Sequence, residues 1–155
     1  MFNRFFPILT MKTSTLLQFL PVSPTSTPFL APLLTCSIPA GFPSPASDYM
    51  DERLDLSEYL GLHAEATFFL RVQGDSMQGA GIFDGDLLVV DRTVQAKSNH
   101  VVIAVIDGEF TVKRLQRRGG RTWLKAENPA YPSIELHEGQ ALEIWGVVSH
   151  VVHKP

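Results

Sequence analysis

The sequence is poor in cysteine and in basic charge, and it lacks a long uninterrupted apolar run. Its single cysteine, Cys36, excludes an internal disulfide framework and a zinc site built from cysteines. The formal net charge of −3 argues against a protein that holds nucleic acid by its phosphates, because that mode requires a strong basic excess. No window reaches the roughly 20 apolar residues that span a bilayer. We therefore expect neither direct sequence-specific DNA binding nor a membrane segment.

Histidine is also sparse and scattered. Of the five histidines, only His150 and His153 lie close together. Residues three apart in a strand point to opposite faces of the sheet, so these two are not expected to share a metal ion. We predict no metal site and no cofactor.

Acidic residues are absent before Asp48, and this separates an N-terminal part from the rest of the chain. Eight of the 11 prolines also lie there. Proline breaks helices and removes donors from strand ladders, so an extended or flexible arm is expected. The remainder carries 11 Lys+Arg against 16 Asp+Glu, a net charge of −5.

The apolar residues of this N-terminal part give a passing likeness to a secretion signal. Pro21, Pro24, Pro28 and Pro32 interrupt it repeatedly, however, so that no continuous apolar core remains. Met11 is an alternative start of the chain, and the sequence does not decide between Met1 and Met11.

The acidic part predicts a mainly β, compact, twisted antiparallel domain with one short helix. Asp55 is a candidate N-cap, Glu58 stands at the capping-box position, and Gly61 follows the expected helix. The turn at 107–109 predicts a hairpin, and 117–121 predicts a second turn. Strand-like runs occupy 67–74, 86–91, 100–108, 109–116, 122–127 and 141–152.

Ser76 lies in the glycine-rich stretch VQGDSMQGAG, residues 72–81, where a tight turn is expected. A serine hydroxyl is a poor nucleophile until a base removes its proton. No histidine stands in a suitable context, and the alternative base is a lysine whose pKa is lowered by burial. Lys113, in the middle of the run EFTVKRLQ, is the candidate, although most lysines in strands simply lie on a solvated face. The adjacent Arg114 is expected to face the solvent.

Three blocks occur in order: GDSM at 74–77, GDLLVVD at 85–91 and DGEFTVKRL at 107–115. Together with the stretch from Ala40 to Leu60 and the closing WGVVSHVV, they resemble the LexA/UmuD family of self-cleaving Ser-Lys peptidases. The likeness is strongest to the UmuD-like members, which are accessory subunits of error-prone DNA polymerase V. It covers about residues 40–155 and implies the β-rich fold of the LexA/UmuD C-terminal domain.

The resemblance implies a role for each site residue. Ser76 is the expected nucleophile, Lys113 the neutral general base, and Ala40–Gly41 the scissile bond. Main-chain N–H groups around Ser76 and Met77 are expected to bind the oxyanion, with Met77 packing beneath the serine. Asp75 is expected to support the turn through local hydrogen bonds rather than to act in catalysis.

The resemblance also implies a domain division and partners. Residues 1–40 are the expected flexible arm removed by self-cleavage, and residues 41–155 the Ser-Lys peptidase-like domain. The expected partners are a second copy in a homodimer, a RecA filament on single-stranded DNA, and a UmuC-like Y-family DNA polymerase. The implied function is SOS mutagenesis by translesion synthesis in the cytoplasm.

Three other interpretations remain open at this stage. A LexA-like repressor requires an N-terminal helix-turn-helix, which a proline-rich arm of this length does not provide. A signal peptidase shares the Ser-Met and Lys-Arg pairs but requires a membrane anchor. A polymerase-binding module with a vestigial dyad has no feature in the sequence that excludes it.

Overall fold

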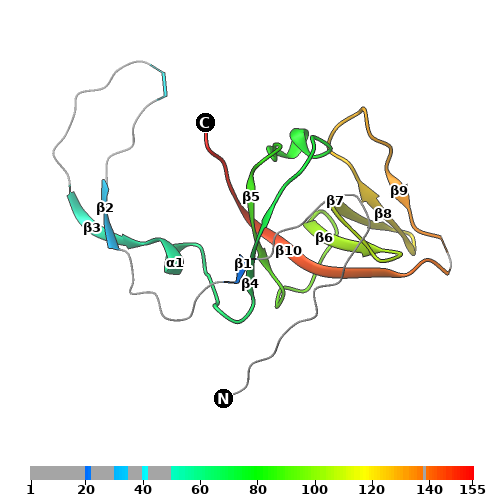
Figure 1. The fold of residues 1–155 in the computed structure, drawn as a ribbon, viewed down its shortest axis with the longest axis horizontal. Helices are drawn as coiled ribbons and strands as arrows, with labels where there is room; N and C mark the ends of the chain where they lie inside the picture. The colour runs from blue at the N-terminus through cyan, green and yellow to red at the C-terminus, as the bar shows by residue number, and fades with distance from the viewer. Residues whose placement is uncertain (1–19, 22–29, 35–39, 42–49, 138) are drawn as a thin grey trace.

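Antiparallel strands dominate the protein, as the computed structural model shows (Figure 1). The structure describes residues 20–21, 30–34, 40–41, 50–137 and 139–155. An eight-stranded sheet has the order β1-β4-β5-β10-β6-β7-β8-β9, and β2 pairs with β3 in a separate ribbon. The strands are β1 (Leu20–Pro21), β2 (Leu30–Leu34), β3 (Met50–Asp55), β4 (Thr67–Arg71), β5 (Leu87–Asp91), β6 (Val101–Ile106), β7 (Glu109–Arg118), β8 (Arg121–Lys125), β9 (Ile134–Glu135) and β10 (Leu142–Val152). The predicted fold class is confirmed.

Both predicted turns join neighbouring strands. β6 and β7 pair in register from Ile106↔Glu109 to Val101↔Arg114. Asp107 and Gly108 connect them with positive φ angles of 50° and 87°, as expected for a two-residue hairpin loop. Residues 119 and 120 connect β7 to β8 in the same way. The hairpin places β7, the strand that carries Lys113, in the interior of the sheet.

Two hydrophobic clusters form the core, and β6 contributes to both. Ile103 belongs to the first cluster, whereas Val102 and Ala104 belong to the second. Alternate residues of a strand point to opposite faces, so the division shows that β6 is buried on both sides. This explains why its sequence is a continuous apolar run rather than an alternating one.

β10 is the longest strand and connects the two halves of the sheet. Its first half pairs with β6, and its second half pairs with β5. The register shifts between Ile144 and Gly146 on the β6 side, and between Val148 and His150 on the β5 side. Such bulges bend a strand and increase its twist, which lets one strand serve two neighbours.

Helices are short. The helix α1 (Leu56–Tyr59) begins as predicted at its N-cap Asp55, whose side chain accepts hydrogen bonds from the N–H groups of Ser57 and Glu58. A 3-10 helix, η1 (Gln78–Ala80), follows Ser76. In the parts of the chain that the structure covers, no helix is long and apolar enough to cross a membrane.

The predicted arm, residues 1–40, is described only in part. Residues 30–34 form β2, which pairs with β3 across Leu30↔Asp55 to Leu34↔Met50, and residues 20–21 form β1 beside β4. The sequence analysis expected an extended segment here but did not predict these strand pairs. The prediction that the arm is flexible otherwise falls outside the described residues.

Candidate active site

Ser76 lies in the turn between β4 and β5, directly before η1. Main-chain hydrogen bonds from Gln78 N to Asp75 O and from Ala80 N to Met77 O form the turn. Gly81 ends η1 in the left-handed conformation, with a φ of 73°, which a glycine adopts without strain. The side chain of Met77 is buried in the first hydrophobic cluster.

The segment before Ser76 is held by the loop at residues 83–86. Val72 N donates to Asp86 O at 2.8 Å, and Gly85 N donates to Val72 O at 2.9 Å. Gly74 N donates to the Asp84 carboxylate at 2.6 Å. These contacts fix the path of the chain as it approaches the serine.

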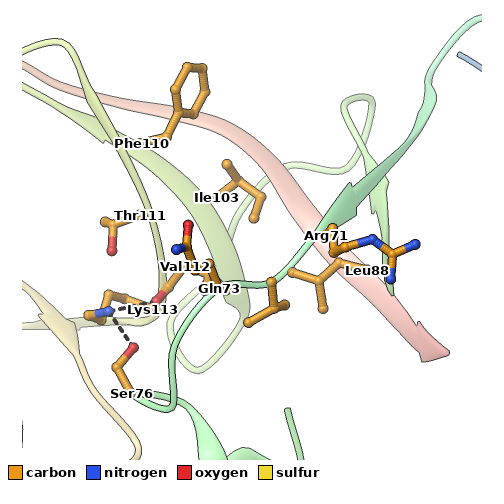
Figure 2. A pocket seen from close by; sticks show the side chains of 10 residues that line it. Arg71, Gln73, Ser76, Leu88, Ile103, Phe110, Thr111, Val112 and Lys113 are labelled. Carbon is orange, nitrogen blue, oxygen red and sulfur yellow. Dashed lines mark hydrogen bonds between the residues drawn. The ribbon is translucent and has the colours of Figure 1, made fainter. Parts of the chain in front are cut away.

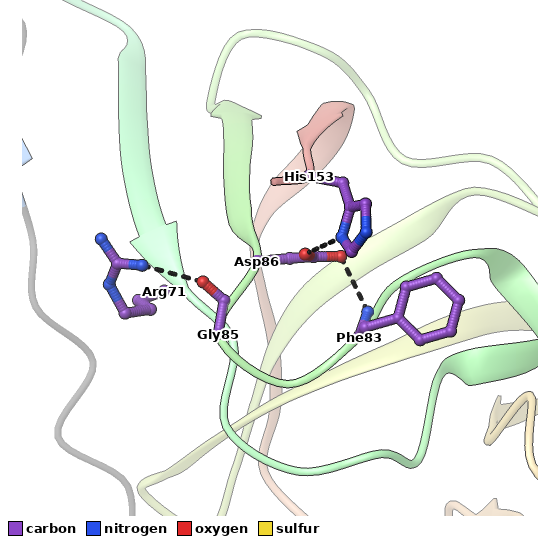
Figure 3. Close-up of polar contacts among 5 residues, drawn as sticks. All are labelled: Arg71, Phe83, Gly85, Asp86 and His153. Carbon is purple, nitrogen blue, oxygen red and sulfur yellow. Dashed lines mark hydrogen bonds and ion pairs between the residues drawn. The ribbon is translucent and has the colours of Figure 1, made fainter. Parts of the chain in front are cut away.

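Asp86 anchors this loop to the end of the chain (Figure 3). Its side chain is buried, accepts a hydrogen bond from Phe83 N at 2.8 Å, and lies 2.7 Å from His153 Nδ1. Burial by itself would raise the pKa of Asp86, but the hydrogen bond from Phe83 and the contact with His153 outweigh it and leave the pKa below 3.8. Asp86 is therefore ionised at neutral pH.

Lys113 on β7 reaches the serine hydroxyl (Figure 2). Its Nζ lies 2.8 Å from Ser76 Oγ and donates a second hydrogen bond to Val112 O at 2.9 Å. The residue is only 8% exposed, and this burial lowers its pKa below 10.5. Among the described residues, no carboxylate forms an ion pair with Lys113. The ammonium thus lacks the partner that would stabilise its charge.

A cavity of about 110 Å³ opens beside this pair. Its polar lining comes from Ser76 and Lys113 together with Arg71, Gln73 and Thr111, and its apolar lining comes from Val72, Leu88, Ile103, Phe110 and Val112. Figure 2 shows the serine and lysine at one end of this lining and the apolar side chains above and beside them. The candidate nucleophile and an apolar recess are therefore adjacent.

The main-chain N–H groups expected to bind an oxyanion are those around Ser76 and Met77. Within the described part of the chain, neither Ser76 N nor Met77 N donates a hydrogen bond.

Asp75 contacts both the turn and a distant segment. Within the turn, its main-chain oxygen accepts a hydrogen bond from Gln78 N at 3.2 Å. Its carboxylate accepts a hydrogen bond from the hydroxyl of Tyr131, which raises the pKa of Tyr131 above 10.0. Its main-chain oxygen accepts a hydrogen bond from Asn128 Nδ2 at 3.0 Å. Asp75 does not line the cavity that contains Ser76 and Lys113.

Ala40 and Gly41, the predicted cleavage pair, are both exposed and do not line this cavity. Figure 1 shows their short segment beyond β2 and β3, away from the sheet that carries Ser76. The structure thus brings Ser76 and Lys113 together but does not bring the predicted scissile bond to them. Their neighbours Ile38, Pro39, Phe42 and Pro43 lie outside the described residues.

The segment that follows β8 contacts the serine turn, although no feature of the sequence predicted a role for it. Glu127 contacts the turn through its main chain, and its side chain pairs with Arg114 at 2.6 Å. Arg114 is therefore a partly buried member of an ion pair, whereas it was expected to face the solvent. A Glu-Asn pair after a strand is a common loop sequence, so no local signal distinguished this segment.

Comparisons with known proteins agree with this architecture. Residues 32–149 match the family described as Peptidase S24-like. Protein SamA of Salmonella typhimurium is 51% identical over 80% of this chain and 86% of its own length. Protein MucA of Escherichia coli is 48% identical over 73% of this chain and 77% of its own. The LexA repressor of Ectopseudomonas mendocina is 41% identical over 76% of this chain but only 57% of the repressor.

Proposed function

Since the chain belongs to the Peptidase S24-like family and to its LexA/UmuD group, we propose that it is a serine endopeptidase that cleaves its own Ala40–Gly41 bond. The observation that carries this proposal is the 2.8 Å contact between Lys113 Nζ and Ser76 Oγ. The burial that lowers the pKa of Lys113 favours its neutral amine, which is the form that acts as a general base.

The proposed reaction has two steps. Neutral Lys113 takes the proton of Ser76 Oγ as this oxygen attacks the carbonyl carbon of Ala40. The oxyanion is bound by the N–H groups of Ser76 and Met77. The bond to the Gly41 nitrogen then breaks, and the Lys113 ammonium donates its proton to this leaving amine. Water, deprotonated by Lys113, then attacks the carbonyl carbon of the Ala40 ester. The bond to Ser76 Oγ breaks, and the Lys113 ammonium returns a proton to this oxygen, which restores the serine and releases the Ala40 carboxylate.

The substrate segment has to move for this reaction. Ala40 and Gly41 are exposed and outside the cavity. Ser76 lies 35 positions after Gly41, and a chain of this length spans at most roughly 115 Å when fully extended. The stretch also contains β3, α1 and β4, so its actual reach is shorter than this. In our proposal the segment enters the site of the same chain or that of a second copy.

The cellular role that we propose follows the resemblance to UmuD-like proteins. A RecA filament on single-stranded DNA stimulates cleavage after DNA damage. The trimmed protein, residues 41–155, forms a homodimer in the cytoplasm and assists a UmuC-like Y-family polymerase in translesion synthesis and SOS mutagenesis. The relatives named above support this role through their similarity.

The test is incubation of the purified chain at mildly alkaline pH, with and without activated RecA filaments. We expect a shortened product from the native chain and none from Ser76→Ala, Lys113→Ala or Lys113→Arg, because a guanidinium does not act as a base near this pH. Cleavage by Lys113→Arg would contradict the role of Lys113. An intact native chain under both conditions would favour a polymerase-binding module with a vestigial dyad.

A further inference from the structure

The segment Glu127–Tyr131 runs along the turn that carries Ser76, and four hydrogen bonds join the two. Glu127 N donates to Ser76 O at 2.9 Å, and Gly79 N donates to Glu127 O at 2.6 Å. Asn128 and Tyr131 bind the main chain and the carboxylate of Asp75. The turn is therefore fixed to this segment on both sides of the serine.

The contact between Glu127 and Gly79 leaves no room for a side chain. A Cβ atom on Gly79 would lie 2.5 Å from Glu127 O, which is main chain and has no rotamer by which to withdraw. Glycine at position 79 thus allows the two backbones to approach closely. Gly79 therefore permits the contact between the turn and the segment at residues 127–131.

The side chain of Glu127 makes a second connection, to the strand that carries the base. Its carboxylate lies 2.6 Å from Arg114 Nε, and Arg114 also donates to Asn99 O at 2.7 Å. The two side chains are 27% and 20% exposed, so solvent screens this pair less than it screens a surface pair. Arg114 directly follows Lys113 along β7.

We propose that Glu127 is a positioning residue for the dyad: its main chain holds the turn of Ser76, and its carboxylate holds the Lys113 strand through Arg114. This inference rests on the function proposed above for the same pair. Ser76 and Lys113 lie 37 residues apart in the sequence. Glu127 contacts both the turn that carries Ser76 and, through Arg114, the strand that carries Lys113. A misplacement of reacting groups by about 1 Å can cost on the order of a hundredfold in rate.

The test is a double-mutant cycle with Glu127→Ala and Arg114→Ala, read as the plateau rate of self-cleavage at alkaline pH. We expect each single variant to lower this rate by about tenfold. The double variant should lower it little further, because both substitutions remove the same ion pair. Glu127→Gln keeps an oxygen acceptor and should recover part of the rate. Glu135→Ala, which removes the 3.6 Å pair with Arg121 on the exposed side of β8, is the matched control and should leave the rate unchanged.

A second readout does not depend on cleavage. NMR titration of lysine-labelled protein gives the pKa of Lys113 in the folded chain, while thermal unfolding reports whether each variant is folded. We expect Glu127→Ala to move the pKa of Lys113 back toward 10.5, because a displaced turn admits water to the ammonium. Folded variants with unchanged pKa and unchanged rate would overturn the positioning role. If the native chain does not cleave, the proposed function fails, and the pKa alone decides this inference.

Discussion

Lys113 is the residue whose surroundings matter most for the proposed chemistry. It is placed among apolar strands, its Nζ contacts Ser76, and burial lowers its pKa below 10.5. A lysine on a solvated strand face would retain its proton at neutral pH and would be unable to accept another. The fold therefore supplies the property that distinguishes a base from an ordinary surface lysine.

A first prediction concerns the cost of burying this lysine. Lys113→Met should raise the free energy of unfolding at pH 7 by about 1 kcal/mol, because it removes a polar group from an apolar site. The folded pKa lies below the unfolded value of 10.5, so between these two values the folded protein binds fewer protons. The stability of the native chain rises with pH in that interval, and the advantage of Met should shrink there. Urea unfolding between pH 7 and pH 10.5 measures the difference in free energy of unfolding between Lys113→Met and the native chain. A difference that does not change with pH would contradict the prediction.

A second prediction concerns Asp86, which holds the loop beneath the serine. Its pKa is lowered below 3.8, so it stabilises the fold above that pH and loses this contribution as the pH falls through its folded pKa. Asp86→Asn should lower the free energy of unfolding at pH 7 by about 1–2 kcal/mol. The difference in free energy of unfolding between Asp86→Asn and the native chain should become smaller below pH 3.8. Glu65→Gln, at an exposed carboxylate, is the control and should show no comparable loss at either pH.

At the scale of elements, most strands and both hairpins were predictable from the sequence. The run 101–106 is apolar without interruption, and Asp107–Gly108 after it is a two-residue turn signal, so β6 and β7 followed from local rules. The helix α1 followed from its N-cap Asp55. These features depend on neighbours in the chain, which is why one sequence sufficed.

The contacts between distant segments were not predictable in the same way. Glu127 joins the serine turn to β7 only because the sheet folds β8 back beside β7. The short strand β9 and the ribbon of β2 and β3 carry no turn signal or alternation strong enough to predict them. The pairing of Ser76 with Lys113 was expected from the resemblance to a family, not from the spacing of the two residues.

A third prediction concerns the bulge in β10. A Cβ atom on Gly146 would lie 2.6 Å from Val90 Cγ1 and 3.3 Å from Asp91 O, and Val90 is fully buried. Gly146→Ala should therefore destabilise the fold by about 1–3 kcal/mol through overpacking. Thermal or urea unfolding measures the loss.

Two further variants test the reason for this effect. Val90→Ala removes the clashing methyl group, so the loss in Gly146→Ala/Val90→Ala should be smaller than the sum of the single losses. Gly41→Ala, at an exposed site with nothing within 4 Å, should leave stability nearly unchanged. Strict additivity of the two core substitutions would exclude the steric explanation.

At the scale of the whole molecule, the chain combines a proline-rich, acid-free N-terminal part with an acidic β body. The body contains the paired serine and lysine, while the predicted scissile bond is exposed outside the cavity. The described conformation therefore keeps the proposed nucleophile apart from the proposed scissile bond. Cleavage requires the segment around residues 40–41 to enter the cavity of its own or a second chain, and we expect a stimulating partner to act on this step.

The masses of the cleavage products show directly whether Ser76 cleaves the Ala40–Gly41 bond. The purified native chain is held at mildly alkaline pH, which favours the neutral form of Lys113, and every fragment is weighed by intact mass spectrometry. We expect two fragments, one that ends at Ala40 and one that begins at Gly41, and neither from Ser76→Ala. Cleavage at any other bond, or the same two fragments from Ser76→Ala, would contradict it.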